Sequence, residues 1–306
     1  MSMREAPTVN VSTMQLQYLV AVDRSRTWAK AADSIGVTQS ALSQGIAELE
    51  RRLGIELFAW SGRRRVPLSH TAEVVTYARR VLAETGDLGR RLAQVRTGHV
   101  GRLRIGVIDA AAVDHFPQTF RAFRAARPQL DFHVSVAPTG ELLERLRGGE
   151  IDIAVCVDPV DHADIDVVPL LAEELAVYAP PHALVGVPAT WGPWVLFPER
   201  SITRQAIDSQ LRALGAPVRL AAESHQPEVL CEMVRLGIGW SVLPTVQAEK
   251  GPEPLRRARN EPLVLRTLVA ATRQAAPAHP AAVELIAALC AHSTTERAVR
   301  NASGGE

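Results

Sequence analysis

Apolar positions recur with helical spacing over roughly the first 70 residues of the chain. Two of the helix-like runs are separated by Gly36, a residue that accepts the left-handed conformation often found where helices end. Thr38 follows at the position of a helix N-cap, and Gly54 marks the expected end of the second run. Two short helices joined by a tight turn that contains glycine predict a helix-turn-helix over about 31–50.

The second helix of this motif carries polar side chains in its first turns. Such side chains can hydrogen-bond to base edges, and base contacts fall near the start of a recognition helix. On spacing alone, an ordinary helical hairpin with a solvated polar face is an equal alternative. The candidate DNA-binding residues of this helix are Thr38, Gln39, Ser40, Ser43 and Gln44.

A turn with three consecutive arginines follows this helix. Arg63, Arg64 and Arg65 lie in the segment 61–68, where the sequence predicts the hairpin of a winged helix-turn-helix. The arginines of such a hairpin meet phosphates or enter the minor groove. A solvated surface loop is the alternative, and the preceding helix-turn-helix favours the wing.

The next segment has the pattern of a long linker helix. Its apolar residues recur at spacings of four and three over about three heptads, which is typical of a coiled-coil seam. We expect a second copy of the chain as the partner, since a DNA reader with two half-sites needs a dimer; packing against its own domain is the alternative. The seam residues are Val74, Ala78, Val81, Thr85, Leu88, Leu92 and Val95.

Beyond Gly101, strand-like runs alternate with helix-like runs. Such alternation predicts mainly parallel sheets covered on both faces. Two of the expected strands are Ile165–Leu170 and Leu175–Tyr178. The expected divisions are a tail (1–13), the winged helix-turn-helix (14–71), the linker helix (72–98), an effector-binding domain (101–292, with subdomain I at about 101–170 and 266–292 and subdomain II at about 171–265) and a disordered tail (293–306).

Charge separates the two parts of the chain. Up to Gly98 there are 14 basic and 9 acidic residues, whereas the remainder has 20 and 24. A basic N-terminal third suggests a polyanionic partner for that end of the protein. With 47% apolar and 22% charged residues, no run near the ~18 apolar residues of a membrane helix and no visible secretory signal, the chain is expected to be cytoplasmic.

Motifs for metal, cofactor or nucleotide chemistry are not found. The three cysteines, Cys156, Cys231 and Cys290, are far apart and are expected to be core residues. No GxGxxG, HExxH or GxSxG pattern occurs, and neither lysine fits a phosphate-binding loop. We therefore expect no cofactor, no metal and no enzyme activity.

Several segments resemble the LysR-type transcriptional regulator family. The likeness covers about 14–289 in the family's order and rests on segments 16–22, 37–43, 49–58, 146–155 and 236–244. It implies a winged helix-turn-helix, a dimerising linker helix and a periplasmic-binding-protein-like α/β effector domain of two subdomains. It also implies double-stranded DNA and a small-molecule effector as partners, and a homodimer that assembles further into a homotetramer.

Some positions differ from the family pattern. Ser40, Gln44, Trp60 and Ala72 stand where the family usually has proline, arginine, arginine and glycine, so the family's DNA preference does not transfer. Glutamine can pair with adenine but cannot make arginine's bidentate contact with guanine. Gly45, inside the recognition helix, is interpreted as trading helix stability for a bare surface.

Effector contacts are expected where strands lead into helix N-termini, and the resemblance points to the same loops. Helix N-termini favour a carboxylate on the ligand and Asp109 an amine, which suggests an amino-acid-like or other polar metabolite. Simple helix caps are the alternative for Thr139, Ser201 and Thr203, and a two-domain α/β enzyme with a nucleic-acid-binding module is the alternative for the whole chain. The candidate residues are Asp109, Ala110, Thr139, Ser201, Ile202 and Thr203, to which the resemblance adds His225.

Overall fold

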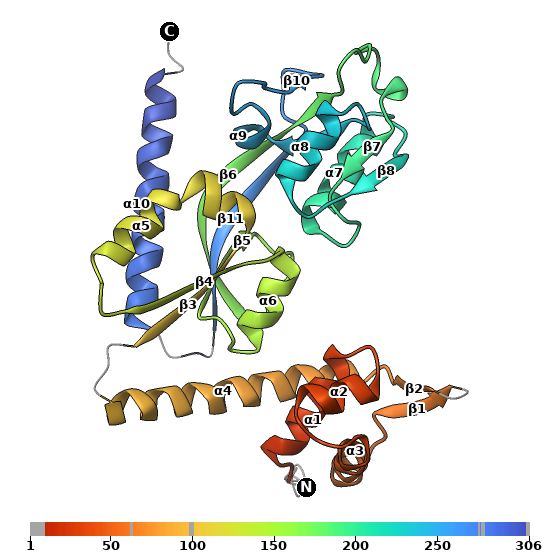
Figure 1. The fold of residues 1–306 in the computed structure, drawn as a ribbon, viewed down its shortest axis with the longest axis vertical. Coiled ribbons are helices and arrows are strands. Elements are labelled where there is room, and N and C mark those ends of the chain that lie inside the picture. The colour runs from red at the N-terminus through yellow and green to blue at the C-terminus, as the bar shows by residue number, and fades with distance from the viewer. Residues whose placement is uncertain (1–9, 62–63, 98–100, 275, 277–278, 304–306) are drawn as a thin grey trace, which may run out of the picture. The chain divides into compact units, whose positions relative to one another are not determined.

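The chain forms two compact units that separate between Thr97 and Gly98. The first unit holds helices and one hairpin, and the second holds two α/β cores (Figure 1). The computed structural model describes residues 10–61, 64–97, 101–274, 276 and 279–303, with the backbone alone at 64, 90–91, 93–97 and 294–303.

Three helices open the first unit, and each has a polar side chain at its N-cap. The Ser12 hydroxyl accepts the N–H of Gln15, and the Gln15 side chain accepts the N–H of Ser12. Thr27 and Thr38 cap the next two helices through their hydroxyls. The third helix ends at Gly54, whose φ of 71° is left-handed. The helices are α1 (Thr13–Arg24), α2 (Trp28–Ser34) and α3 (Gln39–Leu53).

α3 approaches α1 closely because a glycine lies at their contact. A Cβ atom on Gly45 would lie 2.3 Å from Cδ2 of the Tyr18 ring, far inside van der Waals contact. The interpretation of Gly45 as a bare surface position is therefore wrong: the missing side chain makes room for an aromatic ring. Buried Leu19, Leu42 and Ile46 complete the contact between these helices.

A two-stranded hairpin follows α3 and is tied to its last turns. One carboxylate oxygen of Glu50 accepts the N–H groups of Leu57 and Phe58, at 2.8 and 3.1 Å. The first strand therefore starts at a fixed place relative to the helix. In the antiparallel register Trp60 lies opposite Arg65. The strands are β1 (Phe58–Ser61) and β2 (Arg64–Pro67).

The first unit ends in a long helix, α4 (Thr71–Thr97). Val75 and Ala78 of this helix are buried in the same core as α1, whereas Leu88 and Leu92 further along are 57% and 60% exposed. α4 therefore packs on its own unit only over its first turns.

The first core of the second unit surrounds a mixed sheet. β3 (Arg102–Val107) pairs in parallel with β4 (Asp131–Val136) and β5 (Ile153–Val157). The long strands β6 (Ile165–Ala179) and β11 (Val264–Arg273) are antiparallel to each other and run on into the second core (Figure 1). The helical elements of this core are η1 (Ala111–His115, a π-helix), α5 (Pro117–Ala125), α6 (Thr139–Arg147) and α10 (Pro280–Ser303).

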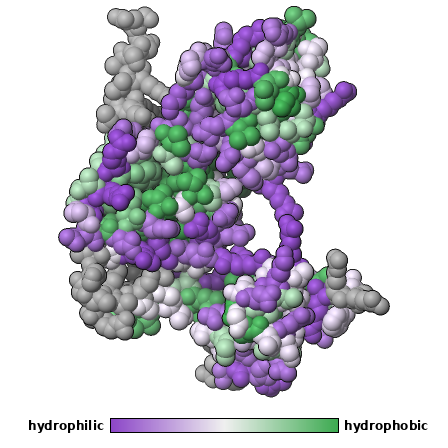
Figure 2. All heavy atoms as spheres, viewed as in Figure 1, coloured by the Kyte–Doolittle hydropathy of each residue, from purple (hydrophilic) through white to green (hydrophobic). Residues whose placement is uncertain are grey.

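The second core lies at the other end of β6 and β11. Its largest buried side chains are aromatic, and the rings of Trp191 and Trp240 stack with 5.5 Å between centroids. On the face shown in Figure 2, hydrophilic residues cover much of the surface and apolar residues form smaller patches. The other elements of the second core are η2 (Pro188–Thr190), β7 (Trp194–Leu196), α7 (Ile202–Ala213), β8 (Leu220–Glu223), α8 (Pro227–Arg235), β9 (Ser241–Pro244), α9 (Thr245–Ala248) and β10 (Arg256–Arg257).

Two expectations about the sheets are wrong. The described pairs of β11 with β5, and of β6 with β9, β10 and β11, are antiparallel, so the large sheet is mixed and not mainly parallel. The strands expected at Ile165–Leu170 and Leu175–Tyr178 are one strand. Its polar centre stays in the sheet because Glu173 pairs with Arg266 on the neighbouring strand.

The prediction of disorder for 293–306 is wrong over the described residues 293–303, which continue α10. Ser293 is buried, and its hydroxyl donates to the carbonyl of Leu289 at 3.0 Å. The following residues include alanine, glutamate and arginine, which favour helix although the segment as a whole is small and polar. The expected first tail is also one residue too long, because α1 begins at Thr13.

We predict that Gly45→Ala destabilises the chain. Alanine gains about 1 kcal/mol over glycine in an exposed helix, but here the clash with Tyr18 should cost about 1–3 kcal/mol and win. Gly89→Ala is the matched control, since a Cβ there meets nothing within 4 Å. Urea unfolding of the full chain measures both variants at equal concentration. Equal stabilisation by the two substitutions would contradict the prediction.

Candidate functional site

The N-terminal end of α3 presents polar side chains to solvent. Gln39, Ser40 and Gln44 are exposed and Ser43 is half-buried. Thr38 is exposed too, but its hydroxyl accepts the N–H of Ala41 at 3.1 Å and so caps the helix. This end of α3 therefore offers amide and hydroxyl groups of the kind that pair with base edges.

The hairpin places its one fully described arginine among aromatic rings. Arg63 lies outside the described residues, and only the backbone of Arg64 is described. The guanidinium carbon of Arg65 lies 5.0 Å from the ring centroid of Trp28 and 5.3 Å from that of Trp60. Both are cation–π distances, so Arg65 is engaged within the unit and does not project as a free cation.

The predicted seam of α4 divides into two halves. Ala78 is fully buried in the core of its own unit, and Val74 and Val81 pack against that core, so these three do not form a free face. For these three residues, the alternative prediction of packing against their own domain is therefore the correct one. Leu88 and Leu92 are exposed, Thr85 is exposed with its hydroxyl donating to the Val81 carbonyl, and the side chain of Val95 lies outside the description.

Two of the predicted effector contacts serve the backbone. Ser201 caps α7, its hydroxyl accepting the N–H of Arg204 at 3.0 Å. The Thr139 hydroxyl accepts the N–H of Val157 at 3.3 Å. Both hydroxyls thus have local structural roles.

The other predicted contacts lie in different surroundings. Ala110 is buried in the first core, and Ile202 packs against that same core although it opens α7 of the second. His225, before α8, is exposed. The structure therefore brings Ile202, but not His225, against the first core.

Buried charged groups join the two cores at the crossing strands. The Glu173 carboxylate accepts Arg266 Nε at 2.5 Å and lies 2.6 Å from Nε2 of His115, at the end of η1. Arg266 also donates from Nη1 to the Thr203 hydroxyl at 2.9 Å. We call these four residues the junction. Its side chains come from η1, β6, α7 and β11.

The junction holds Glu173 ionised. Its side chain is 2% exposed, and this burial raises the pKa of the carboxyl. The interactions with Arg266, whose guanidinium is charged, and with His115 outweigh burial and bring the pKa of Glu173 below its usual value. Glu173 and Arg266 form a buried pair of opposite charges, and a buried charge is tolerated when it is paired in this way.

A second group of carboxyls lies nearby, and its negative charge is only partly compensated. Asp109, just after β3, lies against the carboxyl of Glu228 in the first turn of α8. Burial, then the neighbouring Glu228 and Asp114, raise the pKa of Asp109 to about 6. Asp114 is 2% exposed and accepts Lys250 Nζ at 3.2 Å with one oxygen. Its other oxygen is buried and has no hydrogen-bond partner within the described part of the chain.

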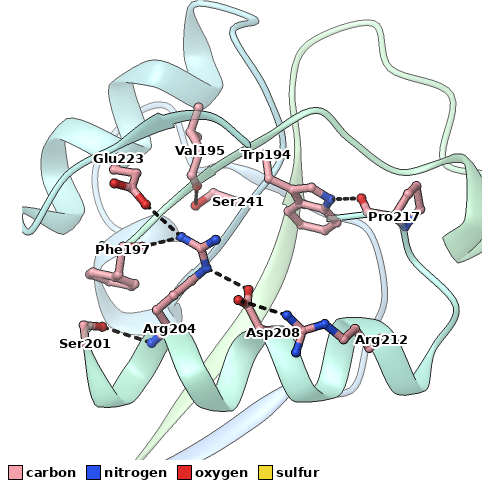
Figure 3. A network of polar contacts seen from close by, with 10 residues as sticks. All are labelled: Trp194, Val195, Phe197, Ser201, Arg204, Asp208, Arg212, Pro217, Glu223 and Ser241. Atoms are coloured by element: carbon pink, nitrogen blue, oxygen red, sulfur yellow. Dashed lines mark hydrogen bonds and ion pairs between the residues drawn. The ribbon is translucent and has the colours of Figure 1, made fainter. Parts of the chain in front are cut away.

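A buried arginine fixes the start of α7 (Figure 3). Arg204 donates to the Asp208 carboxylate at 2.7 Å, to the Phe197 carbonyl at 2.8 Å and to the Glu223 carboxylate at 3.1 Å. The loop between β7 and α7 is therefore held from inside, and the N-terminus of α7 is pre-positioned.

Sequence reasoning missed most of these charged residues. His115, Glu173, Arg204 and Arg266 were not singled out, nor was Glu228. The available signal was a charged residue inside or between apolar strand runs, as at Glu173 and Arg266. Such a residue must be paired when buried, but its partner is not visible from the local pattern.

The cysteines and the helices carry no further chemistry that we can identify. Burial, with a smaller contribution from Asp158, raises the pKa of the Cys156 thiol to about 12, and burial raises that of Cys231 to about 11. Among the described residues, no group of three metal-binding side chains gathers, and no helix is long and apolar enough to cross a membrane.

Family models match nearly the whole chain. The model of the bacterial regulatory helix-turn-helix protein, lysR family, matches residues 13–73, and that of the LysR substrate binding domain matches 96–293. The chain belongs to the LysR family of transcriptional regulators. It is thus a DNA-binding regulator with an effector-binding domain, as the sequence motifs predicted.

Relatives and solved structures agree. The chain is 32% identical to the HTH-type transcriptional regulator GbpR of Azospirillum brasilense over 72% of this chain and 67% of that one. It is 33% identical to a probable hydrogen peroxide-inducible genes activator of Mycobacterium avium over 75% and 76%. The LysR regulator CbnR shares the fold at 20% identity, with a TM-score of 0.58 over 92% of this chain and 99% of that one. CbnR has also been solved in a complex with its target DNA, which matches with a TM-score of 0.56 over 92% of this chain and all of that one.

We predict that the contribution of Asp109 to the stability of this LysR regulator falls as pH rises from about 4 to above 6. The unfolded Asp109 carboxyl titrates near 3.8 and the folded one near 6, so in that window the folded chain holds more protons. The contribution is full below pH 4 and is lost as pH rises through 6. Between pH 4 and 7 the melting temperature of Asp109→Asn should therefore fall less, or rise more, than that of the parent chain.

Asp166→Asn, at an exposed position of β6, is the control and should keep the parent pH profile. If Asp109→Asn and the parent showed the same pH dependence, the assignment of the raised pKa to Asp109 would be wrong.

Proposed function

We propose that the polar end of α3 reads bases in the major groove of duplex DNA. The observation that carries this is the exposure of Gln39, Ser40 and Gln44 on a capped helix whose other face is locked to α1. Rigid placement matters because base readout needs donors and acceptors held within hydrogen-bond reach. Half-buried Ser43 lies between these side chains on the helix and is assigned to the same surface.

We predict that Gln44→Ala weakens binding selectively at one base pair. Losing one side-chain pairing with a base should cost ~1–3 kcal/mol for the preferred duplex and little for a duplex changed at that position. Binding of the full chain to duplexes selected from a random pool, and to their single-base variants, measures this.

Arg64→Ala is the contrasting variant. It should weaken binding to every duplex. The slope of log affinity against log salt concentration should become shallower by about one counterion for each arginine lost from the complex. A uniform loss of affinity for Gln44→Ala would contradict base readout by that residue.

We further propose that the second half of α4 joins two copies of the chain. Leu88 and Leu92 are exposed four residues apart on one helix face, beyond the part of α4 that its own unit covers. A helix exposing leucines at this spacing is typical of a helix–helix interface. Two copies would supply the two reading helices that a pair of half-sites requires.

We predict that Leu88→Glu separates the copies. A carboxylate in an apolar helix seam would lose hydration without a partner, at a cost of several kcal/mol. Sedimentation should show a monomer that no longer binds its duplex. Val160→Glu, at an 89% exposed position in the second unit, should leave the assembly unchanged. If Leu88→Glu assembled as the parent chain does, the proposed interface on α4 would be wrong, and the main interface would have to lie in the second unit.

The effector is proposed to carry a cationic group that binds beside the junction. Asp109, Glu228 and Asp114 place three carboxyls together, with one buried oxygen of Asp114 unpaired among the described residues. A ligand amine would supply the missing positive charge. An amino-acid-like molecule fits best, since the pre-positioned N-terminus of α7 favours a carboxylate at the other end. In its presence the pH dependence assigned to Asp109 should be reduced, because a bound cation keeps that carboxyl ionised.

Two other functions are less well supported. Some relatives are named as hydrogen peroxide-inducible activators, but the raised pKa values of Cys156 and Cys231 disfavour the thiolate that reacts with oxidants. For an enzyme, Ser201 and Thr203 would be the candidate nucleophiles. Their hydroxyls accept hydrogen bonds from Arg204 N–H and the Arg266 guanidinium, groups that cannot act as general bases. We therefore propose ligand sensing without turnover.

A further inference from the structure

The hairpin exposes a large aromatic ring. Trp60 is 68% exposed, whereas Phe58, two residues earlier on the same strand, is only 8% exposed. Side chains two apart on a strand share a face. One face of the hairpin therefore begins in the core of the unit and ends at an exposed indole.

A stack of side chains fixes that indole. Arg65, opposite Trp60 in the register, contacts Trp60 on the hairpin and Trp28 at the start of α2. Trp28 in turn meets Phe58 edge-on, with 5.2 Å between ring centroids. We call Phe58, Trp28, Arg65 and Trp60 the aromatic ladder. It connects the exposed ring to the core, so the ring is pre-positioned and loses little freedom on binding.

Arg65 is poorly placed to bind a phosphate itself. Its Nη1 atom is buried and has no hydrogen-bond partner within the described residues. The side chain also lines a pocket of about 230 Å³ with Trp28 and Phe58, and Trp60 is not among the lining residues. The guanidinium of Arg65 therefore contacts mainly the indole rings of Trp28 and Trp60. Of the aromatic ladder, Trp60 is the residue that is exposed to a binding partner.

We infer that Trp60 inserts its exposed indole into the minor groove of the bound duplex, with Arg65 as the residue that positions it. This rests on the proposed binding of DNA by α3. Glu50 ties the hairpin to the end of α3, so the hairpin lies beside the duplex once α3 is in the major groove. Apolar side chains that enter the minor groove contact the sugars and wedge between base steps. An indole releases no counterions there, unlike an arginine.

Salt dependence separates this contact from an ionic one. Trp60→Ala should weaken binding to a duplex selected from a random pool about tenfold at every salt concentration, with an unchanged salt slope. Trp60→Phe should retain most of the affinity. Trp60→Arg should bind with a slope steeper by about one counterion for each hairpin. Val66→Ala, on the other face of the hairpin, is the matched control and should bind as the parent does.

Fluorescence tests the contact without relying on the alanine variant. The chain has five tryptophans, so the difference between the parent and Trp60→Phe isolates the signal of Trp60. Saturating duplex should quench that signal and shield it from acrylamide.

The outcomes separate this inference from the proposed function. If the duplex binds while Trp60 stays equally accessible, or if Val66→Ala weakens binding and Trp60→Ala does not, the inference fails and DNA reading by α3 stands. If no duplex is bound by the parent chain, the proposed function itself fails.

Discussion

The buried ion pair between Glu173 and Arg266 sets the register of the two strands that both cores of the second unit share. Slipping one strand by a single residue would turn one charge away from the other and leave both unpaired in the interior. Removing one partner of such a pair typically costs about 3–5 kcal/mol. The pair also reaches His115 of η1 and Thr203 of α7. Elements of both cores are thus linked through the ion pair between Glu173 and Arg266.

The carboxyls beside this ion pair differ in how their charge is compensated. Glu173 is paired with Arg266, lies within hydrogen-bond distance of His115 and has a lowered pKa, so its charge serves the fold. Asp109 lies against another carboxyl and has a raised pKa, and the cation of this group, Lys250, pairs with Asp114. This contrast separates a structural carboxylate from the one that we propose as a ligand contact. A cation that binds at Asp109 would act next to the strands that link the cores, where a small shift affects both.

In the first unit, close packing and one side-chain hydrogen bond fix the positions of α1, α3 and the hairpin. Gly45 lets α3 lie against Tyr18, and Glu50 ties the hairpin to the end of that helix. The polar end of α3 and the exposed ring of Trp60 are therefore held in a fixed relation. The proposed contacts of both groups with one duplex would depend on this rigidity.

The sequence by itself determined the features that depend on near neighbours along the chain. Thr38 and Ser201 cap their helices through residues three positions on, Gly54 ends α3 with its own φ, and the polar start of α3 follows from helical spacing. Local pattern failed where partners are distant: Glu173 meets Arg266 across 93 positions and His115 across 58. The ladder around Arg65 likewise joins α2 to the hairpin. Only the tertiary structure decides such pairs, because strand pairing and helix packing, and not sequence spacing, determine which charges and rings share one interior.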